Sequence, residues 1–289
     1  MWRKKIWLWA QQLAPQHPLS RFAGWVATCE SPIVKDRIIR WFIQRYGVDM
    51  SIAQRSEPED YQHFNDFFTR QLRKEARPIQ PQANAFVSPV DGTIAQIGQL
   101  EKQTLIQAKG HHYTLSHLLA DPAPDPRFED GLYTTVYLAP RDYHRIHMPM
   151  AGRLTMMRYV PGQLFSVNQA TAADVPNLFA RNERVICQFD TAYGPMILVL
   201  VGAMIVGSIA TEWAGVVAPS TSSTVQTWYY QTTDFPGIYF EQGADIAHFR
   251  LGSTVIVILP KNKAAWHAAC TLDSTLQMGQ VLASFQASK

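Results

Sequence analysis

The first 75 residues place apolar side chains at the spacing of α-helices. Ser31-Pro32 is typical of a helix start, with serine as N-cap and proline in the first turn, and Gly47 is typical of a helix stop. A second helix is predicted over residues 57–74, where aromatic residues recur on one face. Between Pro32 and Gly47 the apolar positions form one stripe: Ile33, Val34, Ile38, Trp41 and Phe42.

From residue 85 the pattern changes to short runs of β-branched and aromatic residues, broken by glycine, proline and aspartate. Six runs are predicted as strands: 85–88, 133–138, 153–160, 184–189, 196–206 and 254–259. Their spacing favours an antiparallel or mixed β core. The longest apolar stretch, 196–210, contains two glycines and a serine and is short for a membrane-spanning helix, so it is assigned to core strands.

Composition narrows the class of protein. Of 289 residues, 47% are hydrophobic and 17% are charged, which is typical of a folded globular protein and excludes disorder. Three cysteines without CxxC spacing indicate neither a disulfide framework nor a zinc knuckle. No GxGxxG follows a strand and no GxxxxGK[ST] occurs, so nothing supports nucleotide binding.

Positive charge is concentrated at the N-terminus. Residues 1–45 hold eight Lys/Arg against two acidic residues, a net charge of +6, whereas the remainder carries −3, and five of the eight tryptophans lie in the same segment. Basic charge interleaved with tryptophan suits helices lying on anionic lipid. A helix packed on the core is the alternative, and no motif supports nucleic acid. Residues 6–10 are too short for the apolar core of a signal peptide, so we expect a peripheral protein on the cytoplasmic side of the cell membrane.

Two segments carry side chains suited to acid–base chemistry. Ser-Pro-Val-Asp-Gly-Thr at 88–93 is either a tight turn or a turn whose Asp91 orients an imidazole. The segment 142–149 holds His144 and His147, which are either buried hydrogen-bonded histidines, a metal pair or acid–base groups. Flanking prolines oppose a helix, and in an extended chain these two side chains point to opposite faces, so a shared metal is disfavoured and no metal site is expected.

A third segment precedes the last strong strand. Gly252-Ser253-Thr254 is either a plain turn or the site of a nucleophilic serine, and it is not the GxSxG elbow of α/β-hydrolases. Glycine before serine permits strained backbone conformations. Alone, each of the three segments is a weak signal.

Together, in this order, the three segments resemble those of the membrane-associated bacterial phosphatidylserine decarboxylases. They are Phe-Val-Ser-Pro-Val-Asp-Gly at 86–92, Tyr-His-Arg-Ile-His-Met-Pro at 143–149 and Leu-Gly-Ser-Thr at 251–254. The resemblance continues through 162–168, 178–185 and 201–207, so it covers nearly the whole chain. One departure is Ala247-His248, where the family pattern leads us to expect glycine and a polar residue.

We therefore expect an α+β fold in two regions. Residues 1–76 would form membrane-associating helices, and residues 77–289 a catalytic, mainly antiparallel or mixed β domain with a biotinyl/lipoyl-like barrel character. The resemblance implies self-cleavage between Gly252 and Ser253 into a β chain, 1–252, and an α chain, 253–289, that stay associated. A homodimer is a further expectation.

The resemblance also implies the chemistry. Ser253 would attack the carbonyl of Gly252 in its own chain and become a pyruvoyl group, which forms a Schiff base with phosphatidylserine and releases CO₂ to give phosphatidylethanolamine. His147 would be the base that activates Ser253, and Asp91 would hold its tautomer. His144 would return the proton, with Asp142 as a weaker candidate to orient either histidine.

The substrate site is less constrained. Phe165 and Ser166 resemble family positions near the substrate, and neither a metal nor pyridoxal phosphate is needed. Two alternatives from other classes stay open: a serine peptidase or esterase using Ser253, and a non-enzymatic membrane-bound β module. By charge alone, four arginines are candidate partners for the headgroup phosphate: Arg145, Arg153, Arg181 and Arg184.

Overall fold

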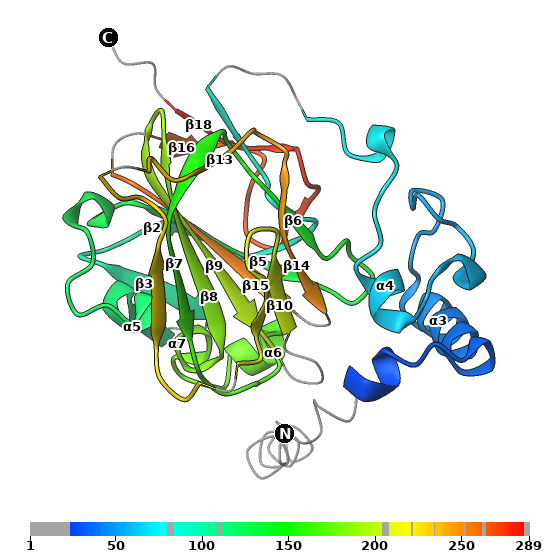
Figure 1. Cartoon of the computed structure of the whole chain (residues 1–289). Helices are drawn as coiled ribbons and strands as arrows, with labels where there is room; N and C mark the ends of the chain where they lie inside the picture. The colour runs from blue at the N-terminus through cyan, green and yellow to red at the C-terminus, as the bar shows by residue number, and fades with distance from the viewer. Residues whose placement is uncertain are drawn as a thin grey trace.

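The computed structural model describes residues 24–79, 84–108, 111–203, 208–220, 222–233, 235–250, 253–261 and 264–285. Helices α3 (Pro32–Tyr46) and α4 (Phe64–Phe68) lie to one side of a larger β-rich body (Figure 1). The change from helical to β pattern predicted from residue 85 is present, because the first strand, β1 (Ala85–Val87), begins at Ala85. Residues 1–23, which hold four of the eight basic residues and three of the five tryptophans of the N-terminal segment, lie outside the described residues.

Helix α3 has the predicted boundaries. It begins with Pro32 in its first turn and ends at Gly47, which adopts the left-handed conformation at φ 67°. Ser31 makes no side-chain capping bond, so proline rather than a serine cap sets the start. The apolar stripe is divided: Ile39 and Phe42 are buried, whereas the predicted stripe residues Ile33, Val34 and Trp41 are exposed.

The predicted helix over 57–74 is wrong. This stretch holds the single α-helical turn α4 between two 3₁₀ turns, η1 (Pro58–Asp60) and η2 (Lys74–Ala76). Its aromatic residues pack with Phe42 of α3 in a cluster of their own, which also includes Tyr61, Phe64, Phe67 and Phe68. So short a segment takes its conformation from tertiary packing rather than from helical propensity.

The β-rich body contains four sheets, and every pairing between its named strands is antiparallel. The nine-stranded sheet contains β2 (Gly92–Gln99), β5 (Leu132–Leu138), β7 (Gly152–Val160), β8 (Arg184–Thr191), β9 (Gly194–Gly202), β12 (Gln226–Tyr229), β13 (Ile238–Phe240), β15 (Ser253–Leu259) and β17 (Thr275–Leu276). The four-stranded sheet contains β6 (Arg145–His147), β10 (Ser208–Thr211), β11 (Gly215–Ala218) and β14 (Asp245–Arg250).

The two remaining sheets are small. One contains β1 (Ala85–Val87), β16 (Ala264–Trp266) and β18 (Val281–Phe285), and the other pairs β3 (Thr104–Ala108) with β4 (His111–Thr114). Short helices add α5 (Leu115–Leu119), η3 (Pro126–Phe128), α6 (Gln169–Ala172) and α7 (Leu178–Arg181). The nine-stranded sheet runs in the order β12-β7-β8-β9-β15-β5-β2-β17 and has two open ends among the described residues, so the expected barrel character is not confirmed.

The central strands β9 and β15 are buried on both faces. In β15, Val255 and Val257 belong to one hydrophobic core, whereas Ile256 and Ile258 belong to a second core on the opposite face, where residues of α5, α6 and α7 also pack. Strand β9 alternates in the same way. Two covered faces explain why these strands are continuous apolar runs in the sequence.

Three neighbouring strands cross together from the large sheet to the four-stranded sheet. Strands β9, β15 and β5 are adjacent in the first, and the strands connected to them, β10, β14 and β6, are adjacent in the second. Ser253 pairs with Gly202 and Leu138 where the large sheet begins, and Arg250 pairs with Ser208 beyond the crossing. The predicted cleavage site therefore lies in the chain between β14 and β15, the middle pair of these strands in both sheets.

Candidate active site

Ser253 is the first residue of β15 and has no contact with solvent. Its Oγ has no hydrogen-bond partner among the described residues, and neither has Oγ1 of the neighbouring Thr254. A buried hydroxyl without a partner is costly, which marks this position as more than a turn. Gly252, on the other side of the predicted cleavage site, lies outside the described residues.

His144 is the last residue before β6, in the segment that follows Leu138, the strand partner of Ser253. The imidazole is fully buried, packs on the Phe68 ring with 4.2 Å between ring centroids, and places Nδ1 2.9 Å from the backbone oxygen of Asp142. That oxygen can only accept, so Nδ1 carries the proton and Nε2 is an unprotonated acceptor. Nε2 has no partner in the described part of the chain.

Burial also determines the charge of His144. Loss of hydration lowers the pKa of the imidazole to about 3, because the low-dielectric interior disfavours the charged ring. The ring is therefore uncharged at neutral pH. An uncharged imidazole with a free Nε2 lone pair can accept a hydrogen bond, and burial disfavours any proton that it takes up, so such a proton would be passed on.

Asp142 shapes the same connection. Its Oδ2 accepts a 2.7 Å hydrogen bond from the backbone N–H of Ala139, and its own N–H donates to the Ala139 oxygen at 2.9 Å. Burial raises the pKa of this carboxyl. Asp142 orients His144 through its backbone oxygen, in part as the sequence led us to expect.

Asp91 lies at the same end of the sheet as Ser253. Thr93 of β2 and Thr254 of β15 both pair with Tyr137 of β5, which places Asp91 and Ser253 two strands apart. The Asp91 carboxylate accepts from Nε and Nη2 of Arg77, at 2.9 and 2.5 Å, and from the N–H of Met278 at 2.8 Å. No hydrogen bond joins Asp91 to His147 within the described ranges. Arg77 carried no signal in the sequence beyond its position before a proline.

The Arg77–Asp91 pair is expected to be a large contributor to stability. Replacing Arg77 by methionine leaves a buried carboxylate unpaired, which should lower the free energy of unfolding by about 3–5 kcal/mol. Urea denaturation of an uncut Ser253→Ala background, where the chain stays in one piece, measures this. The matched control is Arg127→Met, which breaks the exposed pair with Asp125 and should cost about 1 kcal/mol or less. Equal losses in the two variants would contradict this role of Arg77.

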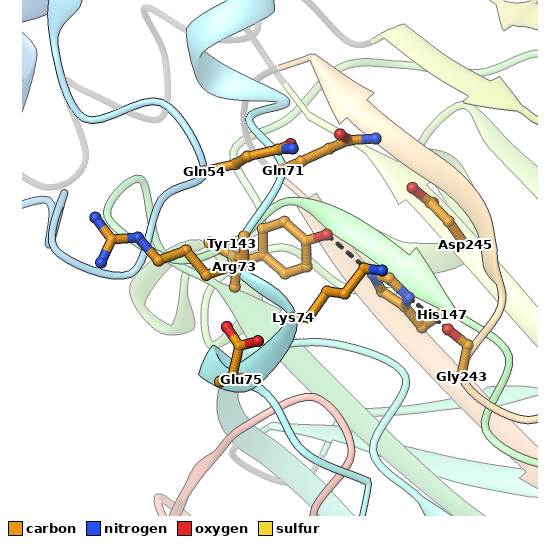
Figure 2. Close-up of a pocket in the computed structure, with 10 residues that line it drawn as sticks. Gln54, Gln71, Arg73, Lys74, Glu75, Tyr143, His147, Gly243 and Asp245 are labelled. Atoms are coloured by element: carbon orange, nitrogen blue, oxygen red, sulfur yellow. Dashed lines mark hydrogen bonds between the residues drawn. The ribbon is translucent and has the colours of Figure 1, made fainter.

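His147 has a different environment from His144. Its Nε2 lies 3.0 Å from the Tyr143 hydroxyl and its Nδ1 2.9 Å from the Gly243 oxygen, so both ring nitrogens are engaged (Figure 2). His147, Tyr143 and Asp245 form one wall of a cavity of about 550 Å³, and residues 71–75 form the facing wall. Of the two histidines, His144 rather than His147 presents a free acceptor beside the crossing strands.

The segment around Phe165 is held near Ser253 through Asn182. The Asn182 Nδ2 donates to the oxygens of Phe165 and Gly202, at 2.8 and 2.9 Å, and Gly202 is the β-sheet partner of Ser253. Phe165 is buried and Ser166 is half-buried. Both predicted substrate-side residues are therefore near the end of the sheet where Ser253 lies.

Comparison with known proteins identifies the family. A family model described as phosphatidylserine decarboxylase matches residues 64–284, and a second, described as PSD, matches residues 6–47. The chain is 51% identical over 279 residues, 96% of each chain, to a phosphatidylserine decarboxylase proenzyme of Marinobacter nauticus. It is 47% identical, over 97% of this chain and 98% of the relative, to the proenzyme of that name from Azotobacter vinelandii. Like these relatives, the chain belongs to the phosphatidylserine decarboxylase family.

Proposed function

We propose that this member of the family cleaves itself between Gly252 and Ser253 and then converts phosphatidylserine to phosphatidylethanolamine and CO₂. The observation that carries the proposal is a fully buried serine whose Oγ has no partner among the described residues, together with a buried, uncharged histidine whose Nε2 likewise has none, in the segment that follows Leu138, the strand partner of Ser253. A serine without solvent contact is suited to attack its own chain, whereas a peptidase or esterase must admit an external substrate. The curated relatives are named as proenzymes, which supports a maturation step.

The self-cleavage needs one base and one nucleophile. His144 Nε2 takes the proton of Ser253 Oγ, and the oxygen attacks the carbonyl carbon of Gly252. The proton then passes from His144 to the nitrogen of residue 253, the C–N bond breaks, and the peptide bond is exchanged for an ester with a free amine. Removal of the Cα proton of residue 253 then breaks the Cβ–O bond and leaves Gly252 with a free carboxylate. Water replaces the nitrogen of the resulting dehydroalanine, and ammonia departs. The hydrogen bonds favour His144 as the base, while the sequence pattern favoured His147 with Asp91, and variants of each distinguish them.

The group formed at position 253 is the pyruvoyl cofactor that the resemblance implies. Its carbonyl supplies an electrophile for the substrate amine and a sink for the electrons that remain when CO₂ leaves. The residues present fit such a group, because residue 253 is held by β9 and β5 on both sides and is shielded from water. His144 is positioned to return a proton to the substrate carbon, and the Phe165–Ser166 segment forms part of the substrate site.

The two chains produced by cleavage stay together. Chain 253–289 contributes β15 between β9 and β5, and it also contributes β17 and β18, which pair with β2 and β1. The region 1–76 and the domain 77–289 are the two functional units of the precursor. A homodimer is an expectation of the resemblance, and no contact within the described residues bears on it.

The N-terminal region is proposed to bind the membrane surface from one side. Helix α3 exposes Ile33, Val34 and Trp41 (57% exposed) on one face, and Trp25 just before it is 71% exposed. Arg37 lies on the same face by helical spacing. Within the part of the chain that the structure describes, no helix has the length and apolar character needed to span a bilayer.

Removing residues 1–12 is expected to weaken binding to anionic vesicles and activity on bilayer substrate, while self-cleavage continues. The deleted segment carries Arg3, Lys4 and Lys5 and three tryptophans. Its cations attract anionic lipid. Salt should weaken this attraction, because exposed charges farther from the lipid than a Debye length, about 8 Å at physiological ionic strength, are screened. Sedimentation with vesicles of full-length and truncated protein at low and high salt measures it.

A pair of point variants controls for loss of exposed aromatic surface in general. Trp41→Ser should lower vesicle binding, whereas Tyr229→Ser on β12, 70% exposed, should leave it unchanged. Equal pelleting of the full-length, truncated and Trp41→Ser proteins would place the membrane contact elsewhere.

A further inference from the structure

Arg70 is a buried cation that forms no ion pair with any residue the structure describes. The residue is 2% exposed, and its Nη2 donates one long bond of 3.3 Å to the backbone oxygen of Arg141. Its Nε and Nη1 have no partner among the described residues, and the guanidinium lies 5.5 Å from the centroid of the Phe67 ring. Burial lowers the pKa of Arg70, because the charged form has lost its hydration.

Arg184 shows how this fold satisfies a buried arginine that serves structure alone. It is also 2% exposed, yet its guanidinium donates to four backbone oxygens at 2.7–2.9 Å. Those acceptors are Leu118, Ala180, Asn182 and His117. The contrast indicates that the missing partners of Arg70 are not a general property of buried arginines here.

The other arginines considered from the sequence are already engaged. Arg145 pairs with Asp245 at 2.5 Å, Arg153 stacks on Tyr239, and Arg181 donates to Gln163 and stacks on Phe165. Arg70, which charge alone did not single out, differs from these arginines in being fully buried with Nε and Nη1 unpartnered among the described residues.

The neighbours of Arg70 in the sequence contact the segment that carries His144 and line a cavity beside it. The two residues before Arg70 contact the segment that carries His144. The Phe68 ring packs on His144, and the Thr69 oxygen accepts a 2.8 Å hydrogen bond from Arg145 Nε. Asp91, Asp142 and Tyr143 all act on the charge of Arg70. The five residues after it, 71–75, line the cavity whose other wall holds Tyr143 and His147 (Figure 2). A ligand in that cavity would lie beside both chain segments that carry Arg70 and His144.

We propose that Arg70 binds the phosphodiester of the phosphatidylserine headgroup. The inference rests on the proposed reaction centre at residue 253. A guanidinium presents a planar fork of donors that matches phosphate oxygens, and a bound anion would offset the desolvation of the buried charge. The substrate carboxylate is the less suitable partner, because it loses its charge as CO₂ forms, and a cation fixed on it would stabilise the ground state more than the transition state. The phosphate keeps its charge throughout.

Binding of a lipid that carries only the phosphate tests the proposal. Dihexanoyl phosphatidylethanol has a phosphodiester but neither amine nor carboxylate, and calorimetry on the processed enzyme reports its affinity. Arg70→Met should weaken its binding about 10- to 100-fold, and Arg70→Lys, which keeps the charge but not the fork, should weaken it less. Dihexanoylglycerol, without the phosphate, should bind all three proteins equally. The kcat/KM for dihexanoyl phosphatidylserine should fall in parallel with the phosphatidylethanol affinity.

The remaining outcomes overturn the proposal. Unchanged phosphatidylethanol binding with a lower kcat/KM would assign Arg70 to the carboxylate or to the reaction itself. An equal loss for dihexanoylglycerol, or failure of both variants to self-cleave, would assign it to structure. Arg127→Met, remote and exposed, should match wild type throughout. Wild-type cleavage and turnover test the proposed function separately, so its failure is distinguishable from failure of the Arg70 proposal.

Discussion

Replacing Ser253 by alanine is expected to leave a single uncut chain of 289 residues without decarboxylase activity. The variant lacks the only atom that the proposed mechanism uses to attack Gly252, so self-cleavage should slow by at least about four orders of magnitude. Intact mass spectrometry is the measurement. Wild type should show two pieces, 1–252 and 253–289, and the smaller piece should lack a free N-terminal amine.

Thr254→Ala is the matched control for Ser253→Ala. Its hydroxyl is also buried and unpartnered, and it is adjacent in β15. This variant should cleave and turn over, because the hydroxyl of residue 254 is not in the reaction. A fully active wild-type preparation that remains one chain, or a Ser253→Ala protein that is cut, would refute the mechanism.

The two histidine variants should separate by their effect on self-cleavage. His144→Ala removes the free Nε2 acceptor near Ser253 and should slow cleavage by about two to four orders of magnitude, the usual contribution of a general base. His147→Ala removes a ring whose nitrogens are already bonded to Tyr143 and Gly243, and it should cleave at a rate closer to wild type. The fraction of uncut precursor against time after synthesis, followed on gels, gives both rates.

The reverse pattern would restore the roles expected from the sequence. There His147→Ala and Asp91→Ala accumulate precursor, whereas His144→Ala is cut but decarboxylates poorly. Imidazole added to His144→Ala provides a further check, since it should accelerate cleavage only if the missing group is the base. A His144→Ala protein that cleaves normally and is also fully active would remove His144 from both steps.

Much of the β core could be predicted from the sequence because its strands are marked by composition. The runs 196–206 and 254–259 correspond to β9 (Gly194–Gly202) and β15 (Ser253–Leu259), whose residues 196–201 and 255–259 alternate between two apolar cores and are therefore all apolar. The helix over 57–74 could not be judged from spacing alone. Its aromatic residues have the spacing of a helix, but the same residues can also pack in a cluster around Phe42. This packing, rather than helical propensity, determines the conformation of the stretch.

Motifs in the sequence suggested the candidate site residues, but not their contacts. Ser253, His144 and Asp91 belong to ordered motifs, and the strand register places Ser253 and Asp91 at one end of the sheet. The hydrogen-bond partners of the candidate residues come from other parts of the chain. Arg77, just after η2, donates to Asp91, and the oxygen of Gly243, before β14, bonds with His147 Nδ1. Such contacts depend on tertiary arrangement and leave no periodic trace in the sequence.

The position of β15 makes refolding of the cleaved enzyme much harder than folding of its precursor. Strand β15 is paired along nearly its whole length on both edges, with β9 and β5, and its chain also supplies β17 and β18. The uncut precursor assembles these pairings within one molecule, because β14 and β15 then belong to one continuous chain. After the cut, the same pairings join two separate molecules, and a protein that unfolds must recover them by collision at cellular concentration. The lifetime of an active molecule is then set by its unfolding rate, and replacement requires new synthesis rather than refolding.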